Sequence, residues 1–229
     1  MKRINLLVVT LCLICSVSVS AQKPFAGHVK SEIRIEGTDD VNITANFPME
    51  TSSTIMGNKS MTKMDFNGIG QLIIQNGDKS QMTFMMDLTA LGMDMYYITK
   101  TINPPKTKEY KYVTDKSDTK TILGYNCYKV TCTMLDLEDD EETITIYYIS
   151  DDFMPGFKHV GDPQFVGYPL LTIQEVSDAT SSYKVITEAK EIKADKKVKD
   201  ATFLLPSSAK PYTEAPEEIQ EAFSGFDDM

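Results

Sequence analysis

Apolar and polar residues alternate along most of the chain, and a period of two predicts β-strands with one buried face. The first such stretch is 25–36, where apolar side chains fall on one face and charged side chains or His28 fall on the other. Further strands are expected at 59–66, 69–75, 79–87, 93–99, 109–113, 125–134, 144–148, 170–176 and 182–193.

Turn residues between these segments predict hairpins. Asn67-Gly68 and Asn76-Gly77-Asp78 each join two alternating segments, and Asn-Gly is a strong hairpin signal. Pro104-Pro105 ends a strand, because proline cannot donate to a central ladder. An acidic stretch from Asp136 to Glu142 joins the arms of a longer hairpin, and Asp178 to Ser181 joins those of another.

The remaining segments are less regular. Residues 151–167 hold several glycines and prolines and are expected to form an irregular loop, and a short strand is expected near 202–205. Only the end of the chain reads as helical. Pro216 suits a first helical turn, and Ile219 and Phe223 then lie on one face, although the acidic tail can equally stay disordered.

About ten strands at hairpin spacing, without intervening helices, predict one antiparallel sheet. The expected fold class is mainly β: a single curved antiparallel sheet, forming a half-barrel or an open barrel, with a short C-terminal helix or tail. No long Pro/Gly/Ser linker interrupts the chain, which favours one domain.

The first 21 residues have the features of a cleaved export signal. Lys2 and Arg3 precede an apolar run over 6–17, and the small residues Val19-Ser20-Ala21 offer a cleavage site. The alternatives are lipidation at Cys15 and an uncleaved anchor. We therefore expect a signal peptide over 1–21, an antiparallel β domain over 22–212 and an acidic tail or short helix over 213–229, in the periplasm or outside the cell.

Removing the signal changes the charge and the cysteine count. It takes away two basic residues and no acidic ones, so the net charge goes from −10 to −12. An acidic chain is repelled by phosphate backbones, which argues against nucleic-acid partners. Only Cys127 and Cys132 remain. Within one strand they would lie roughly 16 Å apart and on opposite faces, too far for a disulfide. Two buried thiols are expected, with pairing between molecules as the alternative.

Four segments carry a family resemblance. The segment 121–129, with sequence TILGYNCYK, resembles a recurring motif in exported bacterial domains of unknown function, which are related in fold to the LolA/LolB lipoprotein carriers. Residues 147–150, 167–170 and 203–206 continue the resemblance in order. It implies a protein of the Gram-negative envelope whose curved sheet has a concave apolar face. It implies no catalytic residue and no cofactor.

Methionine is concentrated in one part of the chain, where nine of the thirteen lie between Met49 and Met95. Flexible, polarizable thioethers suit a surface that adapts to varied apolar ligands. Residues expected to line such a face are Met82, Phe84, Met86, Met93 and Met95. The alternatives are that these residues fill the core, or that they bind copper, although no His or Cys lies nearby.

Catalytic and metal-binding patterns are weak. The acidic loop starts like a calcium loop, but Glu141 stands where the turn glycine belongs, so a solvated hairpin tip is the simpler reading. His28 falls on a polar face, and His159 lies in the Gly/Pro-rich loop close to Phe157. Neither a nucleophile elbow nor a zinc-protease motif is present. We expect no enzyme activity, no metal and no cofactor.

Aromatic residues gather around the same loop and are expected to pack it against the sheet opening: Tyr147, Tyr148, Phe153, Phe157, Phe165 and Tyr168. The function expected from the whole sequence is an exported envelope protein that binds an apolar or lipidic ligand, or a hydrophobic peptide segment, on a concave Met-rich face. The alternative is a structural or protein-interaction module of the envelope that has no small ligand and binds another envelope protein through a strand edge or the aromatic loop.

Overall fold

The computed structural model describes residues 24–45, 47–66, 68–139, 141–177 and 182–223. The expected signal peptide and the last six residues of the tail lie outside the described residues. The strands are β1 Ala26–Glu36, β2 Glu50–Met56, β3 Lys59–Phe66, β4 Ile69–Asn76, β5 Gln81–Asp87, β6 Met95–Thr101, β7 Lys108–Ile122, β8 Tyr125–Asp136, β9 Glu141–Ile149, β10 Lys158–His159, β11 Asp162–Val166, β12 Pro169–Ser177, β13 Ser182–Ala194 and β14 Lys210–Pro211. The helices are α1 Val41–Ala45, α2 Glu217–Ala222 and the 3-10 turns η1 Thr89–Leu91, η2 Asp200–Phe203 and η3 Tyr212–Glu214.

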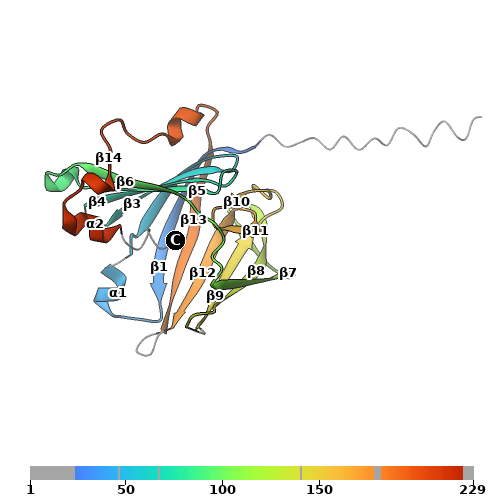
Figure 1. Cartoon of the computed structure of the whole chain (residues 1–229). Helices are drawn as coiled ribbons and strands as arrows, with labels where there is room; N and C mark the ends of the chain where they lie inside the picture. The colour runs from blue at the N-terminus through green and yellow to red at the C-terminus, as the bar shows by residue number, and fades with distance from the viewer. Residues whose placement is uncertain (1–23, 46, 67, 140, 178–181, 224–229) are drawn as a thin grey trace, which may run out of the picture.

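Twelve strands form one sheet in the order β14-β6-β5-β4-β3-β2-β1-β13-β12-β9-β8-β7, and β10 pairs with β11 in a separate hairpin. Every neighbouring pair in the large sheet is antiparallel except β14 with β6. The order ends at β14 and β7, so the sheet is open and not closed into a barrel. Figure 1 shows it curving around the β10–β11 hairpin. The predicted fold class, a curved antiparallel sheet, is confirmed.

The predicted hairpins are present. Phe66 pairs with Ile69 across the first turn, and Asn76 pairs with Gln81 across the second. β8 and β9 are joined at the acidic tip, where Asp136 pairs with Glu141. The alternation of apolar and polar residues predicts these strands because each strand buries one face against a core and exposes the other to solvent.

Three local predictions were wrong. Residues 200–203 form the 3-10 turn η2, not a strand; the Thr202 hydroxyl accepts a hydrogen bond from the Lys199 amide at 3.2 Å, and Phe203 is buried. The expected irregular loop over 151–167 contains the β10–β11 hairpin. β7 runs on to Ile122 through a bulge between Asp115 and Thr119, whose charged residues do not alternate with apolar ones.

The two faces of the sheet are covered by different segments. We call inner the face that carries the β10–β11 hairpin and α2, and outer the face that carries η2. On the inner face, α2 and η3 cover β4 to β6 at one end of the sheet, beside β4 and β6 in Figure 1. The hairpin covers β7 to β9 at the other end, where Phe165 packs against Val130 and Ile149. On the outer face, Val198 and Phe203 pack on β3 to β5.

Cys127 and Cys132 are both buried free thiols, as predicted. Cys127 belongs to the same core cluster as Tyr148 and Leu171, and Cys132 lies on the other face of β8, opposite Tyr112. Burial raises the pKa of each thiol above its ordinary value, so both stay protonated and unreactive near neutral pH. Within the described residues no helix is long and apolar enough to cross a membrane.

Candidate functional site: an aromatic cleft

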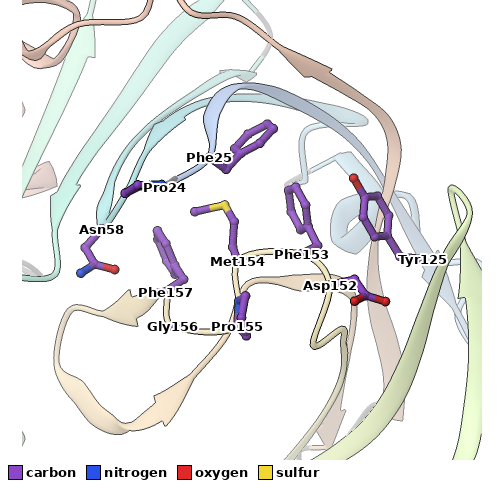
Figure 2. Close-up of a pocket in the computed structure, with 11 residues that line it drawn as sticks. Pro24, Phe25, Asn58, Tyr125, Asp152, Phe153, Met154, Pro155, Gly156 and Phe157 are labelled. Carbon is purple, nitrogen blue, oxygen red and sulfur yellow. The ribbon is translucent and has the colours of Figure 1, made fainter. Parts of the chain in front are cut away.

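An open cleft of about 490 Å³ lies where the loop after β9 meets the start of β1 (Figure 2). Its lining comes from the first described residues, the β2–β3 turn, the start of β8 and the loop 152–157. The lining residues are Pro24, Phe25, Gly57, Asn58, Tyr125, Asp152, Phe153, Met154, Pro155, Gly156 and Phe157. Asp152 is the only charged residue among them. We call this cavity the aromatic cleft.

Phe153 anchors the cleft wall. Its side chain is 3% exposed, and its ring meets Phe25 and Tyr125, each at 5.1 Å between centroids. It also meets Tyr168 edge-on at 5.7 Å, and Tyr168 in turn meets Phe157 at 5.4 Å. Such edge-to-face contacts fix ring orientation as well as burying area. The wall is therefore rigid, although one side of it is open.

Met154 stands between the two phenylalanines. Figure 2 shows its side chain rising from the loop between Phe153 and Phe157, toward Pro24 and Phe25. Its backbone has φ +48°, a left-handed conformation that residues with a Cβ rarely adopt. The Met154 carbonyl accepts hydrogen bonds from the amides of Phe157 at 3.1 Å and Tyr168 at 3.3 Å. These bonds hold a strained backbone that sends a flexible thioether into the cleft.

A polar network ties the cleft loop to two hairpin turns. The Asn58 side chain accepts a hydrogen bond from the Lys158 amide at 3.1 Å and donates one to Asp78 at 2.9 Å. The Lys158 ammonium lies 3.1 Å from the same Asp78 oxygen. These bonds, first that from Asn58 and then that from Lys158, lower the pKa of Asp78. Gly77 permits the close approach, because a Cβ there would lie 2.3 Å from the Lys158 carbonyl oxygen.

The residues predicted to line a ligand face are divided between clusters. Phe84, Met86 and Met93 come together on the inner face beneath α2 and η3, where Phe223 is fully buried. Met95 packs with the outer cluster. The Met82 sulfur accepts a hydrogen bond from the side-chain amide of Gln75 at 3.9 Å. Met82 belongs to neither cluster. That these five residues bind a ligand stays a prediction.

His159, the better histidine candidate, is built into the hairpin next to the cleft. Its Nε2 lies 2.7 Å from the Gly167 carbonyl oxygen, and its ring stacks on Phe165 at 4.5 Å. Burial lowers its pKa, so the ring is neutral near neutral pH. Asp162 pairs with it in the hairpin register, but the Asp162 carboxylate accepts a hydrogen bond from the Tyr112 hydroxyl. Among the described residues no three His, Cys, Asp or Glu side chains are grouped to hold a metal.

The sequence pattern places aromatic residues around this loop but does not reveal the cleft. It predicts that they pack the loop against the sheet, and Phe165 does so, stacked between Tyr112 at 5.6 Å and Tyr147 at 4.3 Å. Phe153 and Phe157 pack too and are almost completely buried, and the open surface of the cleft is supplied by the less buried Phe25, Met154 and Pro155. One residue of the cleft stands out in the sequence: Phe25, at the start of the first expected strand. No local pattern predicts that its ring meets Phe153 on the distant loop.

Comparison with known proteins gives fold neighbours only. No family model matches the chain, and no curated protein matches it. A DUF1329 family protein from Desulfovibrio piger is 9% identical, with a TM-score of 0.26, over 80% of this chain and 91% of that one. A putative outer membrane lipoprotein-sorting protein domain from Vibrio parahaemolyticus is 6% identical, with a TM-score of 0.23, over 79% and 89%. Likeness at this level gives no information on a ligand or a function of this chain.

Proposed function

We propose that this chain is an exported envelope protein that binds an apolar chain, either acyl or a hydrophobic peptide segment, in the aromatic cleft. The observation that supports this is an open cleft of about 490 Å³ with aromatic, Met and Pro walls. Small-molecule sites are typically concave, mostly apolar and about 300–1,000 Å³ in volume. The features of residues 1–21 support export.

Binding should strengthen with the length of the apolar chain until the cleft is full, because each buried methylene contributes about 0.8 kcal/mol. The probe is N-phenylnaphthylamine, whose fluorescence rises in apolar surroundings, and the competitors are hexanol, octanol and decanol. We expect the mature protein to bind the probe and the longer alcohols to displace it at lower concentrations.

A pair of variants locates the binding. Phe25→Ala removes a ring that meets Phe153 at the cleft, and we expect probe affinity to fall at least several-fold. Leu91→Ala removes an apolar side chain that is 60% exposed, away from the cleft, and should leave affinity unchanged. Equal binding by Phe25→Ala and the parent would show that the probe sits elsewhere.

The interaction-module alternative predicts a different surface. An apolar, flat sheet edge would invite another strand, but the edge strand β7 carries charged residues along its exposed side and a bulge at Asp115. Lys116 and Lys129 there pair with Asp151 and Asp118. These features guard the β7 edge against pairing. The other route expected for a partner protein is the aromatic loop, which lines the aromatic cleft. In that case a hydrophobic peptide would displace the probe while free alcohols would not.

A further inference from the structure

A second cavity, of about 270 Å³, lies on the middle strands of the inner face, between the end covered by α2 and the end covered by the β10–β11 hairpin. Its floor carries hydroxyl groups from five strands together with one amide. These floor residues are Ser31, Thr51, Ser53, Ser60, Thr62, Gln75, Thr172 and Thr187. We call this cavity the hydroxyl chamber.

The sheet register places these hydroxyls side by side. Ser31 pairs with Thr51, Ser53 with Thr62, and Thr187 with Thr172, each across a neighbouring strand. Directly opposite residues on one face are close enough for their side chains to interact. Between β1 and β13 the register is offset, because Ser31 pairs with Ala189 and Thr187 pairs with Ile33. Ser31 and Thr187 are therefore diagonal neighbours, and the hydroxyls of β3, β2 and β1 and those of β13 and β12 form two adjoining groups on the face whose two ends are apolar.

Part of this hydrogen-bonding capacity is unused. Ser53 and Thr62 bond to each other at 2.8 Å. The side chains of Ser31, Thr172 and Thr187 make no side-chain hydrogen bond to any residue that the structure describes. Each hydroxyl offers one donor and two acceptor positions. The floor thus presents donors and acceptors toward the cavity.

The chamber also has aromatic walls and carries no charge. Phe157, His159 and Tyr168 line it from the loop side, and no Lys, Arg, Asp or Glu is among its lining residues. His159 is neutral because burial lowers its pKa. A charged ligand would lose its hydration without gaining a partner of opposite charge, which is costly. A neutral ligand with several hydroxyls would meet donors, acceptors and ring faces.

We propose that the hydroxyl chamber binds an uncharged, hydroxyl-rich group, namely a neutral sugar or polyol, either free or as the head of an amphiphile. Its hydroxyls replace water on the Ser and Thr floor, and its C–H faces lie against Phe157 and Tyr168. The site is distinct from the aromatic cleft, but Phe157 lines both cavities. This shared wall is where the head of an amphiphile would meet its apolar tail.

Saturation-transfer NMR on the mature protein tests the proposal with three probes: methyl glucoside, octyl glucoside and sodium glucuronate. We expect transfer to both glucosides and little to glucuronate. Tighter binding of octyl glucoside than of methyl glucoside would identify the amphiphile as the source, and equal binding would identify the free sugar. No transfer to methyl glucoside and to the head of octyl glucoside would overturn the proposal, even if octyl chain signals showed that the aromatic cleft binds.

Isosteric variants confirm the place. Thr172→Val removes a floor hydroxyl and keeps the side-chain shape, so affinity for methyl glucoside should fall about five- to tenfold, as for one lost hydrogen bond. Thr99→Val removes the hydroxyl that bonds Thr83 at 2.8 Å on the outer face and is the matched control. Loss of sugar binding in both variants, or in neither, would contradict the assignment. Unfolding curves of both variants separate loss of binding from loss of fold.

Discussion

Two apolar regions of this molecule have similar side chains, but one is covered by the chain itself and the other borders an open cleft. Under α2, Phe84 and Met86 are sealed by Phe223, which is fully buried and meets Phe84 at 5.5 Å. In the aromatic cleft, Phe153 is equally buried, but Phe25 and Met154 are only partly buried and a space of about 490 Å³ stays open beside them. The difference is whether a later segment of the same chain comes back to cover the surface.

This contrast decides where a ligand fits without rearrangement. An apolar surface that the chain covers becomes core, and its Met and Phe side chains then contribute to stability. An apolar surface that the chain leaves open is buried only when a ligand binds, so its burial contributes to the free energy of binding. By this criterion the aromatic cleft is open in the folded protein, whereas the Met-rich cluster under α2 is covered.

The largest expected effect comes from Phe223→Ala. A helix of six residues is not stable alone, so α2 depends on its packing. Loss of a fully buried ring costs about 3–5 kcal/mol. We expect urea unfolding to show a loss of that size. Because α2 would then leave the sheet, the exposed Met86 and Phe84 should bind N-phenylnaphthylamine in addition to the aromatic cleft.

The control for that variant is Leu204→Ala, whose side chain is 69% exposed and should change stability little. If Phe223→Ala were to unfold at the parent's urea concentration, α2 would not be what seals the cluster. The comparison between the two regions would then fail.

Gly77→Ala should have the next largest effect, at the open region. The new Cβ would lie 2.3 Å from the Lys158 carbonyl oxygen, a backbone atom, so the hairpin tip must move away from the cleft loop. We expect a loss of about 1–3 kcal/mol, typical of overpacking, and weaker probe binding. Gly156→Ala is the matched control, since nothing lies within 4 Å of its Cβ position. Equal stabilities of the two variants would mean that the tip does not support the cleft.

Met154→Gly should separate stability from binding. Glycine adopts φ +48° without strain, so relief of roughly 1 kcal/mol or more offsets the lost side-chain contacts. Net stability should change by less than about 1 kcal/mol, while probe affinity falls several-fold. Leu123→Gly relieves the same kind of strain at φ +50° in the exposed β7–β8 turn, and should leave probe affinity unchanged. If both variants lost probe affinity equally, the loss could not be assigned to the Met154 side chain in the cleft.

The sheet could be predicted from sequence because its evidence is local. Most strands show their own alternation, and the short turn between Phe66 and Ile69 sets the register of its hairpin. β2 does not alternate and was not predicted. Helix α2 was also predicted, from Pro216 and the shared face of Ile219 and Phe223. Two elements were predicted wrongly. β7 carries charged residues on both faces, so it shows no alternation beyond its first residues. In η2 the apolar Phe203 is buried by a 3-10 turn and not by a strand.

The cavities could not be predicted, because they depend on which distant segments return to the inner face. Phe25 and Phe153 are far apart in sequence and meet at 5.1 Å. The hydroxyl chamber needs β1 to lie between β2 and β13, a pairing of the first strand with nearly the last. Alternation assigns Ser31 and Thr187 to a face, but their juxtaposition follows only from strand order.

The smallest expected effect concerns pH and again divides the two regions. Burial lowers the pKa of His159 below its ordinary value of 6.5, so below that pH the unfolded chain binds a proton that the folded hairpin resists. Stability should therefore fall as the pH drops through 6.5.

His159→Gln keeps a donor for the Gly167 carbonyl and cannot be protonated, so its stability curve should be flatter. Hydrogen exchange at mildly acidic pH should show the β10–β11 hairpin opening before α2, because the cluster under α2 contains no histidine. If the stability curve of His159→Gln were as steep as the parent's, the hairpin would not be the acid-sensitive part.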